Sequence, residues 1–133
     1  MFKYMLDTNI VIYVIKRRPL EIMDIFNANA GIMVISSITL AEMLHGVEKS
    51  AAVARNRLAV ENFVSRLTVL RYDDKAAMHY GDIRADLERK GTPIGVNDIH
   101  IAAHARSEGL IVVTNNMRKF NRINGLMLEN WLN

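Results

Sequence analysis

The sequence predicts an α/β domain with three layers, in which a mainly parallel sheet of four or five strands is covered by helices on both faces. Short apolar runs, each long enough for one buried strand, alternate with longer segments whose apolar residues recur every three or four positions. The chain has 133 residues and contains no internal repeat, low-complexity tract or linker. We therefore expect residues 1–133 to form a single domain.

The expected strands are apolar runs that end at polar residues. The first strand, Tyr4 to Leu6, is too apolar to be exposed on both faces, and we place it centrally in the sheet. The remaining strands are expected at residues 32–35, 68–72, 110–113 and 126–128. The strand at 68–72 is expected to be peripheral.

The expected helices have apolar residues spaced three and four apart and begin at capping residues. Residues 10–15 are rich in β-branched side chains, which by propensity favours a strand. The preceding Asp7, Thr8 and Asn9 are all N-cap residues, however, and we therefore predict a helix over residues 9–16. Further helices are expected at residues 20–27, 38–49, 52–67, 73–90 and 97–109.

The composition restricts the kinds of ligand and partner. The formal net charge of +3 is compatible with a nucleic-acid partner but does not require one. The absence of cysteine excludes a disulfide framework and a thiolate metal site. A bound metal would be held by carboxylate, imidazole, amide or water, which favours a hard cation. The longest apolar run is too short for a membrane span and no signal peptide is recognisable, so we expect a cytoplasmic protein with no membrane partner.

Four polar residues are expected at the same edge of the sheet. Asp7 follows the first strand, and Glu42 lies in the first turn of the helix after the second strand. Asp98 begins the helix before the fourth strand, and Asn116 follows that strand. In a doubly wound sheet the first strand lies between the second and the fourth, so these side chains can converge at the switch point. Their oxygen atoms suit Mg²⁺ or Mn²⁺, because crowded carboxylates repel one another without a cation.

Each of these residues also has a purely structural explanation. Asp7 could be an N-cap, and Glu42 could pair with Thr39 in a capping box. Asp98 could favour the helix dipole, and Asn116 could be a turn residue. These roles do not explain why all four residues are expected at one edge of the sheet.

Four segments carry a combined pattern that is much more specific than any one of them. They are Leu6-Asp7-Thr8-Asn9, Ser36-Ser37-Ile38-Thr39-Leu40-Ala41-Glu42, Gly91-Thr92-Pro93-Ile94-Gly95 leading to Asp98, and Val113-Thr114-Asn115-Asn116 with Phe120. In this order they resemble the PIN-domain family, and most closely the VapC toxins of bacterial toxin-antitoxin pairs. The resemblance runs from Asp7 almost to Trp131 and implies a PIN-like fold.

The resemblance implies a Mg²⁺- or Mn²⁺-dependent endoribonuclease. It places Asp7, Glu42 and Asp98 at the positions of the family's metal-binding catalytic carboxylates. Asn116 falls at a further catalytic position, and Asn9 and Thr114 match residues that orient the site. A bound cation would lower the pKa of a water molecule, orient it in line with a phosphodiester and neutralise charge on the phosphate oxygens.

The resemblance also implies partners. The substrate would be tRNA or another folded RNA, and a VapB-type antitoxin would neutralise the activity. The toxins commonly form homodimers, and operator DNA would be bound only indirectly, through the antitoxin. The helices at residues 10–27 and 38–66 offer apolar surface for an antitoxin, including Met23 and Met43, although core burial also explains those residues.

One residue departs from the family pattern. Close relatives often carry an acid immediately before the phenylalanine, whereas Lys119 precedes Phe120 here, so one negative charge becomes positive. This departure counts against a fourth ligand and against a second bound ion. Because of Lys119, an alternative function is also considered, in which a PIN-like module binds RNA or protein without cleaving RNA.

Two further alternatives are weaker. A metal-free nuclease could use histidines as acid and base, the candidates being His45, His79, His100 and His104. Asp98 projects almost opposite to His100 on their shared helix, so we expect surface or partner-facing roles for His100 and His104. A phospho-acceptor receiver domain would need its phosphorylated aspartate near Tyr72-Asp73, after a strand that we expect to be peripheral.

Overall fold

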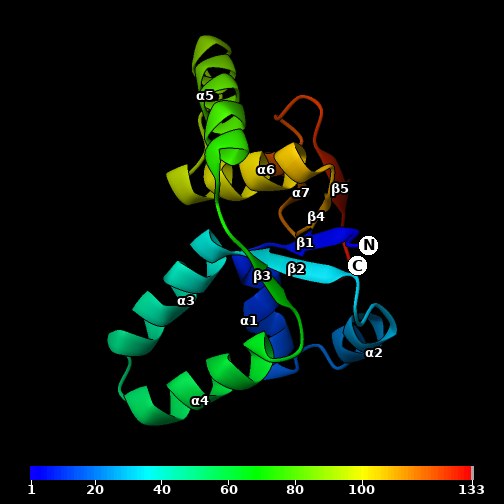
Figure 1. Ribbon diagram of the computed structural model, residues 1–133, viewed down its shortest axis with the longest axis vertical. Coiled ribbons are helices and arrows are strands. Elements are labelled where there is room, and N and C mark those ends of the chain that lie inside the picture. Colours follow the sequence, from blue (N-terminus) through cyan, green and yellow to red (C-terminus); the bar gives the residue numbers. More distant parts are fainter. Residues whose placement is uncertain (133) are drawn as a thin grey trace.

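A five-stranded parallel sheet forms the centre of the computed structural model, which describes residues 1–132 (Figure 1). Its strands are β1 (Tyr4–Leu6), β2 (Met33–Ser36), β3 (Thr68–Leu70), β4 (Ile111–Val113) and β5 (Met127–Glu129). The strand order is β3-β2-β1-β4-β5, and every neighbouring pair is parallel. The expected central position of the first strand and the peripheral position of the third are therefore both confirmed.

Helices cover both faces of the sheet (Figure 1). They are α1 (Thr8–Lys16), α2 (Glu21–Ala28), α3 (Ser37–Glu48), α4 (Val53–Val64), α5 (Asp74–Arg89), α6 (Val96–Glu108) and α7 (Met117–Phe120). The first six lie where the sequence predicts helices, with ends that differ by a few residues. Helix α7 was not predicted, because a single turn has no apolar periodicity to reveal it.

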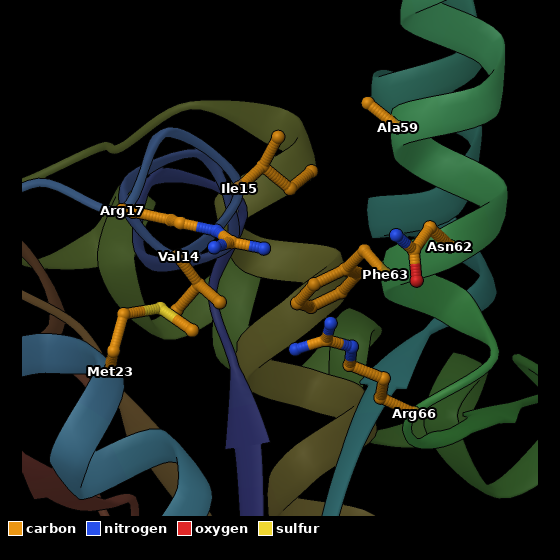
Figure 2. A pocket seen from close by; sticks show the side chains of 8 residues that line it. All are labelled: Val14, Ile15, Arg17, Met23, Ala59, Asn62, Phe63 and Arg66. Carbon is orange, nitrogen blue, oxygen red and sulfur yellow. The ribbon is translucent and has the colours of Figure 1, made fainter.

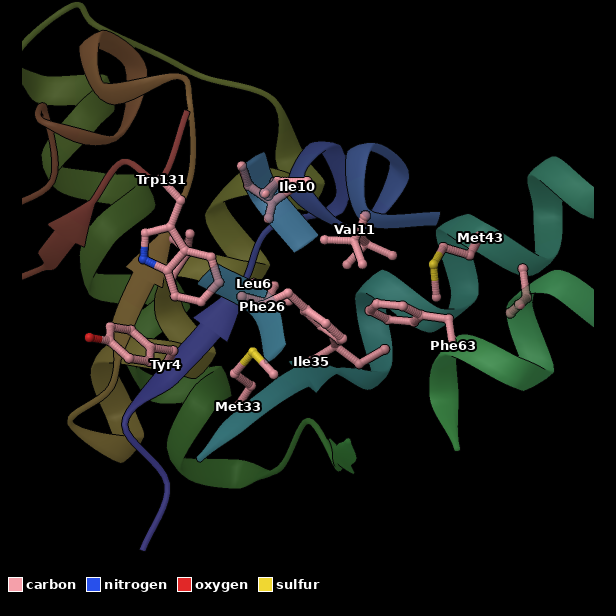
Figure 3. Close-up of a cluster of buried hydrophobic side chains, with 14 of the residues drawn as sticks. Tyr4, Leu6, Ile10, Val11, Phe26, Met33, Ile35, Met43, Phe63 and Trp131 are labelled. Carbon is pink, nitrogen blue, oxygen red and sulfur yellow. The ribbon is translucent and has the colours of Figure 1, made fainter. Parts of the chain in front are cut away.

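The side chains of β1 divide between the two layers that cover the sheet. Tyr4 and Leu6 belong to a cluster formed with α1 to α4, which includes Phe26, Phe63 and Trp131 (Figure 3). Met5 belongs to a second cluster, on the α6 side. This alternation follows from the two-residue period of a strand, and it buries β1 completely.

Helix α1 shows why capping outweighs β-propensity in its segment. Asp7 has extended backbone and accepts a hydrogen bond from the Ile10 N–H at 3.1 Å, which makes it the N-cap. Ile10, Val11 and Val14 are buried at the three-and-four spacing of one helix face. The β-branched residues are thus used for core packing within a helix.

Helices α5 and α6 pack together around small residues. Ala102 and Ala103 of α6 are fully buried and allow close approach of Ile83 and Leu87 from α5. Phe120 of α7 joins the same cluster and is 1% exposed. This packing fixes both α6 and α7 against the sheet. None of the helices within residues 1–132 combines the length and apolar character needed to cross a membrane.

Candidate active site

A cleft of about 440 Å³ lies where β1 and β2 lead into their helices. Its walls come from the start of α1, one face of α3 and the start of α6. The lining residues are Asp7, Thr8, Asn9, Ile12, Glu42, His45, Gly46, Lys49, Asn97 and Asp98. The three predicted carboxylates therefore lie on the walls of one cleft, together with Asn9.

Asp7 is the most buried of these carboxylates, with 3% of its surface exposed. Its Oδ1 accepts the α1 capping bond from the Ile10 N–H, and its Oδ2 accepts a hydrogen bond of 2.6 Å from the Thr114 hydroxyl. Burial raises the pKa of Asp7, and the nearby charge of Asp98 raises it further, while the hydrogen bonds from Thr114 and Ile10 oppose the increase. Asp7 is thus both an N-cap and a carboxylate that gains from a nearby cation.

Glu42 is held by two side chains from other parts of the chain. Its Oε1 accepts a hydrogen bond of 2.6 Å from Thr8, and its Oε2 accepts one of 3.2 Å from Asn97. The expected position of Glu42 in the first turn was wrong, because Ser36 caps α3 and Glu42 falls in the second turn. The capping-box explanation also fails, since Thr39 is buried inside the helix and contacts the Thr8 hydroxyl.

Asp98 lies in the first turn of α6 and meets a basic side chain. Lys119 Nζ donates a hydrogen bond of 2.9 Å to Asp98 Oδ2, and the two groups form an ion pair. Gly95 closes tightly over the same oxygen, since a Cβ at this position would lie 3.2 Å from it. The carboxylate of Asp98 is therefore confined by Gly95 on one side and Lys119 on another.

Thr114 and Asn116 follow the end of β4, and Thr114 contacts Asp7. The Thr114 hydroxyl donates to Asp7 and its oxygen accepts a hydrogen bond of 2.9 Å from the Asn116 N–H. Asn116 is half-buried, precedes α7 and is not among the residues that line the cleft. Thr114 thus contacts Asp7 directly, whereas Asn116 contacts Thr114 through its backbone N–H.

The oxygen atoms of Asp7, Glu42 and Asp98 are suitable ligands for a hard divalent cation, although they are not already gathered around one point. Within residues 1–132, no three His, Asp or Glu side chains are close enough together to hold an ion as they stand. Thr8, Asn97, Thr114 and Lys119 occupy carboxylate oxygens of the cleft instead. All the candidate ligands are oxygen atoms, and the unfavourable ionisation of Asp7 would be relieved by a cation.

Three histidines lie where the sequence did not place them. His104 is fully buried, and its Nδ1 lies 2.8 Å from the Ser36 hydroxyl, so the expected surface role was wrong. The apolar face of α6 against the sheet includes this residue, and burial lowers its pKa. His45 lines the same cleft as the carboxylates, a position that was not predicted for it. The available signal was its place three residues after Glu42 on α3.

His100 is also turned toward protein rather than solvent. It stacks on Tyr80 with ring centroids 4.1 Å apart, and its Nδ1 lies 2.7 Å from the Tyr72 hydroxyl. Burial raises the pKa of Tyr72 to about 12, so this phenol stays protonated at neutral pH. His100 and His104 therefore contact other side chains of the protein, and neither is among the residues that line the cleft.

Comparison with known proteins identifies the family. Residues 4–126 match the family described as PIN domain. The chain belongs to the PIN-domain family. This PIN domain is 62% identical over 132 residues to a protein named Ribonuclease VapC2 from Haemophilus influenzae, covering 99% of this chain and 100% of the relative.

A protein sequence and a solved structure from Salmonella typhimurium extend the comparison. A protein named tRNA(fMet)-specific endonuclease VapC is 56% identical over 131 residues, covering 98% of this chain and 99% of the relative. A solved structure described as DNA-bound VapBC superposes with a TM-score of 0.95, at 56% identity, covering 98% of this chain and 99% of that chain. Within the PIN-domain family the chain therefore groups with the VapC ribonucleases, over nearly its whole length.

Proposed function

We propose that this PIN domain is a divalent-cation-dependent endoribonuclease, the toxin of a toxin-antitoxin pair, and that it hydrolyses phosphodiester bonds of folded RNA. The observation that carries the proposal is the buried carboxylate of Asp7 in a cleft shared with Glu42 and Asp98. A carboxylate so shielded from water ionises readily only beside positive charge. The relative named as a tRNA(fMet)-specific endonuclease supports tRNA as the substrate class.

Asp7 and Asp98 would hold Mg²⁺ or Mn²⁺, and Glu42 would hold the ion or a water molecule attached to it. When bound, such a cation lowers the pKa of a water molecule and neutralises charge on phosphate oxygens. The neighbouring hydrogen-bond donors orient the carboxylates of Asp7 and Glu42. Thr114 and the Ile10 N–H fix both oxygens of Asp7, and Thr8 and Asn97 fix those of Glu42.

The rim of the cleft is suited to flanking RNA phosphates. His45 and Lys49 follow Glu42 along the same face of α3, and both are exposed. Asn9 and Asn97 are exposed as well and add amide donors. Neutralisation of an RNA phosphate by Lys49 releases counterions, so the affinity for RNA should fall as salt increases. RNA loops, in which nucleotides are splayed apart, are the sites most accessible to such a cleft.

The proposed cation dependence is tested by cleavage of total RNA and of purified tRNA. We expect cleavage with Mg²⁺ or Mn²⁺, none with a chelator, and recovery when either cation is added back in excess. Sequencing the new RNA ends would locate the cut sites. Cleavage that persists in chelator would reject the metal mechanism and favour acid-base catalysis by His45. Tight RNA binding without cleavage under every condition would favour the non-catalytic module.

A groove between α1, α2 and α4 is the proposed surface for the antitoxin. It encloses a cavity of about 200 Å³, with a floor that includes Val14, Met23 and Phe63. Figure 2 shows the guanidinium groups of Arg17 and Arg66 extending into it from opposite sides. An apolar floor beside two arginines fits a partner segment that carries apolar side chains and a carboxylate. The solved VapBC relative supports an antitoxin as that partner.

This surface is tested by charge reversal at Arg66. Arg66→Glu should weaken antitoxin binding, measured by calorimetry, because it replaces an attractive contact with repulsion. Arg55→Glu is the matched control, since Arg55 is an exposed arginine of α4 outside the groove. Equal affinities of the two variants for the antitoxin would place the antitoxin elsewhere.

We propose that the protein forms a homodimer in the cytoplasm and reaches operator DNA only through its antitoxin. The DNA-bound VapBC relative supports the last point. Light scattering of the purified toxin should give about twice the 15.1 kDa mass of one chain. Operator binding by the toxin alone would contradict the indirect route.

A further inference from the structure

We infer that Lys119 supplies part of the positive charge that the cleft requires, so that the cleft binds one divalent cation per chain and not two. The inference rests on the proposed function, because it concerns the same carboxylates. It starts from a single contact, the hydrogen bond of 2.9 Å from Lys119 Nζ to Asp98 Oδ2.

The position of Lys119 is fixed by the residue that follows it. Phe120 is 1% exposed and packs among Ile83, Ile99 and Ile123. The turn is closed by a hydrogen bond of 2.8 Å from the Asn121 N–H to the Met117 carbonyl. Because Phe120 anchors α7 in the core, the neighbouring Lys119 is presented to Asp98 by a rigid element rather than by a loop.

Both side chains of the ion pair are partly buried. The side chains of Lys119 and Asp98 are 35% and 31% exposed, whereas every other ion pair within residues 1–132 has at least one side chain exposed by 40% or more. Partly buried pairs are less screened by water and salt than exposed ones. The contact between Lys119 and Asp98 should therefore persist in solution.

The ammonium group and a bound cation can be accommodated together. Asp98 lines the cleft but Lys119 does not, so the lysine reaches the carboxylate from beside the cleft. Asp98 Oδ1 takes part in no hydrogen bond among residues 1–132. One oxygen of Asp98 is thus available to a cation in the cleft while the other keeps Lys119.

Charge balance then limits the number of cations. Asp7, Glu42 and Asp98 carry three negative charges when ionised, and Lys119 contributes one positive charge, which leaves two negative charges. One divalent cation neutralises that remainder. A second would leave an excess of two positive charges close to Lys119, which is electrostatically unfavourable. Lys49, the other lysine near the cleft, is exposed on its rim and makes no hydrogen bond to these carboxylates among residues 1–132.

The experiment is a calorimetric titration of the full-length protein with Mn²⁺, which needs no RNA and no catalysis. We expect one Mn²⁺ per chain for the parent. Lys119→Met should tighten that binding by about tenfold, because it removes a nearby positive charge. Lys119→Glu should bind a second Mn²⁺. Lys90→Met is the matched control, since Lys90 forms an ion pair of 2.8 Å with Asp86 elsewhere on the surface, and it should bind Mn²⁺ like the parent.

Two results would overturn the inference while cleavage of RNA still required a cation. One is two Mn²⁺ ions per chain in the parent. The other is unchanged number and affinity of Mn²⁺ in both Lys119 variants, with thermal unfolding confirming that they are folded. Failure of the proposed function is distinct, because the parent would then bind no Mn²⁺ and would cleave RNA in chelator.

Discussion

The Thr114 hydroxyl donates a hydrogen bond of 2.6 Å to Asp7 Oδ2 and joins residues that are 107 positions apart. Each residue directly follows one of two adjacent parallel strands, and the register of those strands pairs Leu6 with Val113. The hydrogen bond is therefore a consequence of strand register. Through it, the pairing of β1 with β4 sets the orientation of the carboxylate on which the proposed chemistry depends.

Thr114→Val should impair RNA cleavage without unfolding the protein. The substitution keeps the shape of the side chain but removes the hydroxyl, and loss of a group that orients a ligand typically costs about 10- to 100-fold in metal affinity or activity. The hydrogen bond lowers the pKa of Asp7, so its loss should also move the acidic limb of the pH-rate profile to higher pH. Thr114→Ser keeps the hydroxyl and should restore both properties.

Asp7→Asn should make the cation-free protein more stable at neutral pH. Burial raises the pKa of Asp7 in the folded state above its pKa in the unfolded state. The contribution of Asp7 to the free energy of unfolding is therefore favourable below the unfolded-state pKa, and it is lost as pH rises through the folded-state pKa. Asparagine keeps the N-cap and carries no charge. Thermal unfolding in chelator should show a higher melting temperature for Asp7→Asn at pH 7. A lower melting temperature would show that the buried charge is not a cost to folding.

Gly95→Ala should disturb Asp98 while leaving the fold intact. The backbone φ of −59° accepts alanine, but the added Cβ would lie 3.2 Å from Asp98 Oδ2 and press on the carboxylate. We expect weaker Mn²⁺ binding in calorimetry. Gly81→Ala is the control, because a Cβ there meets nothing within 4 Å. In the middle of α5 it should leave Mn²⁺ binding unchanged and stabilise the protein by about 0.5 to 1 kcal/mol.

Stability should decline as the solution becomes acidic, and His104 should contribute to that decline. Burial lowers the pKa of His104, although Asp73 and Glu108 oppose the change. Its contribution is fully present above the unfolded pKa of about 6.5 and is lost as pH falls through the folded value. His104→Gln removes this titration, so the free energy of unfolding from urea denaturation should depend less steeply on pH between 7 and 5. Parallel pH dependences for parent and variant would assign the effect to other groups, such as His100, whose pKa burial also lowers.

Much of the fold could be predicted because its signals are local. The run Tyr4 to Leu6 is a buried strand with the bounds predicted for it, and Asp7 caps α1 as its residue type suggests. The strand order follows from the general rules for doubly wound sheets, and it places Asp7, Glu42 and Asp98 at one cleft.

The features that escaped prediction depend on tertiary packing. His104 is buried because its helix face meets the sheet and Ser36, which no spacing in the sequence specifies. Lys119 contacts Asp98 because Phe120 anchors the single turn of α7, and that turn is too short to be recognised by periodicity. The groove between α1, α2 and α4 likewise arises from how three separate helices pack, and not from any one segment.

The most direct test of the central claim is to measure Mn²⁺ binding and tRNA cleavage on the same preparations of the parent and of Asp7→Asn. We expect the parent to bind Mn²⁺ and cleave tRNA, and we expect the folded variant to lose cleavage together with most of its affinity for Mn²⁺. If Asp7→Asn cleaved tRNA at the parental rate, the buried carboxylate would not be the centre of the site.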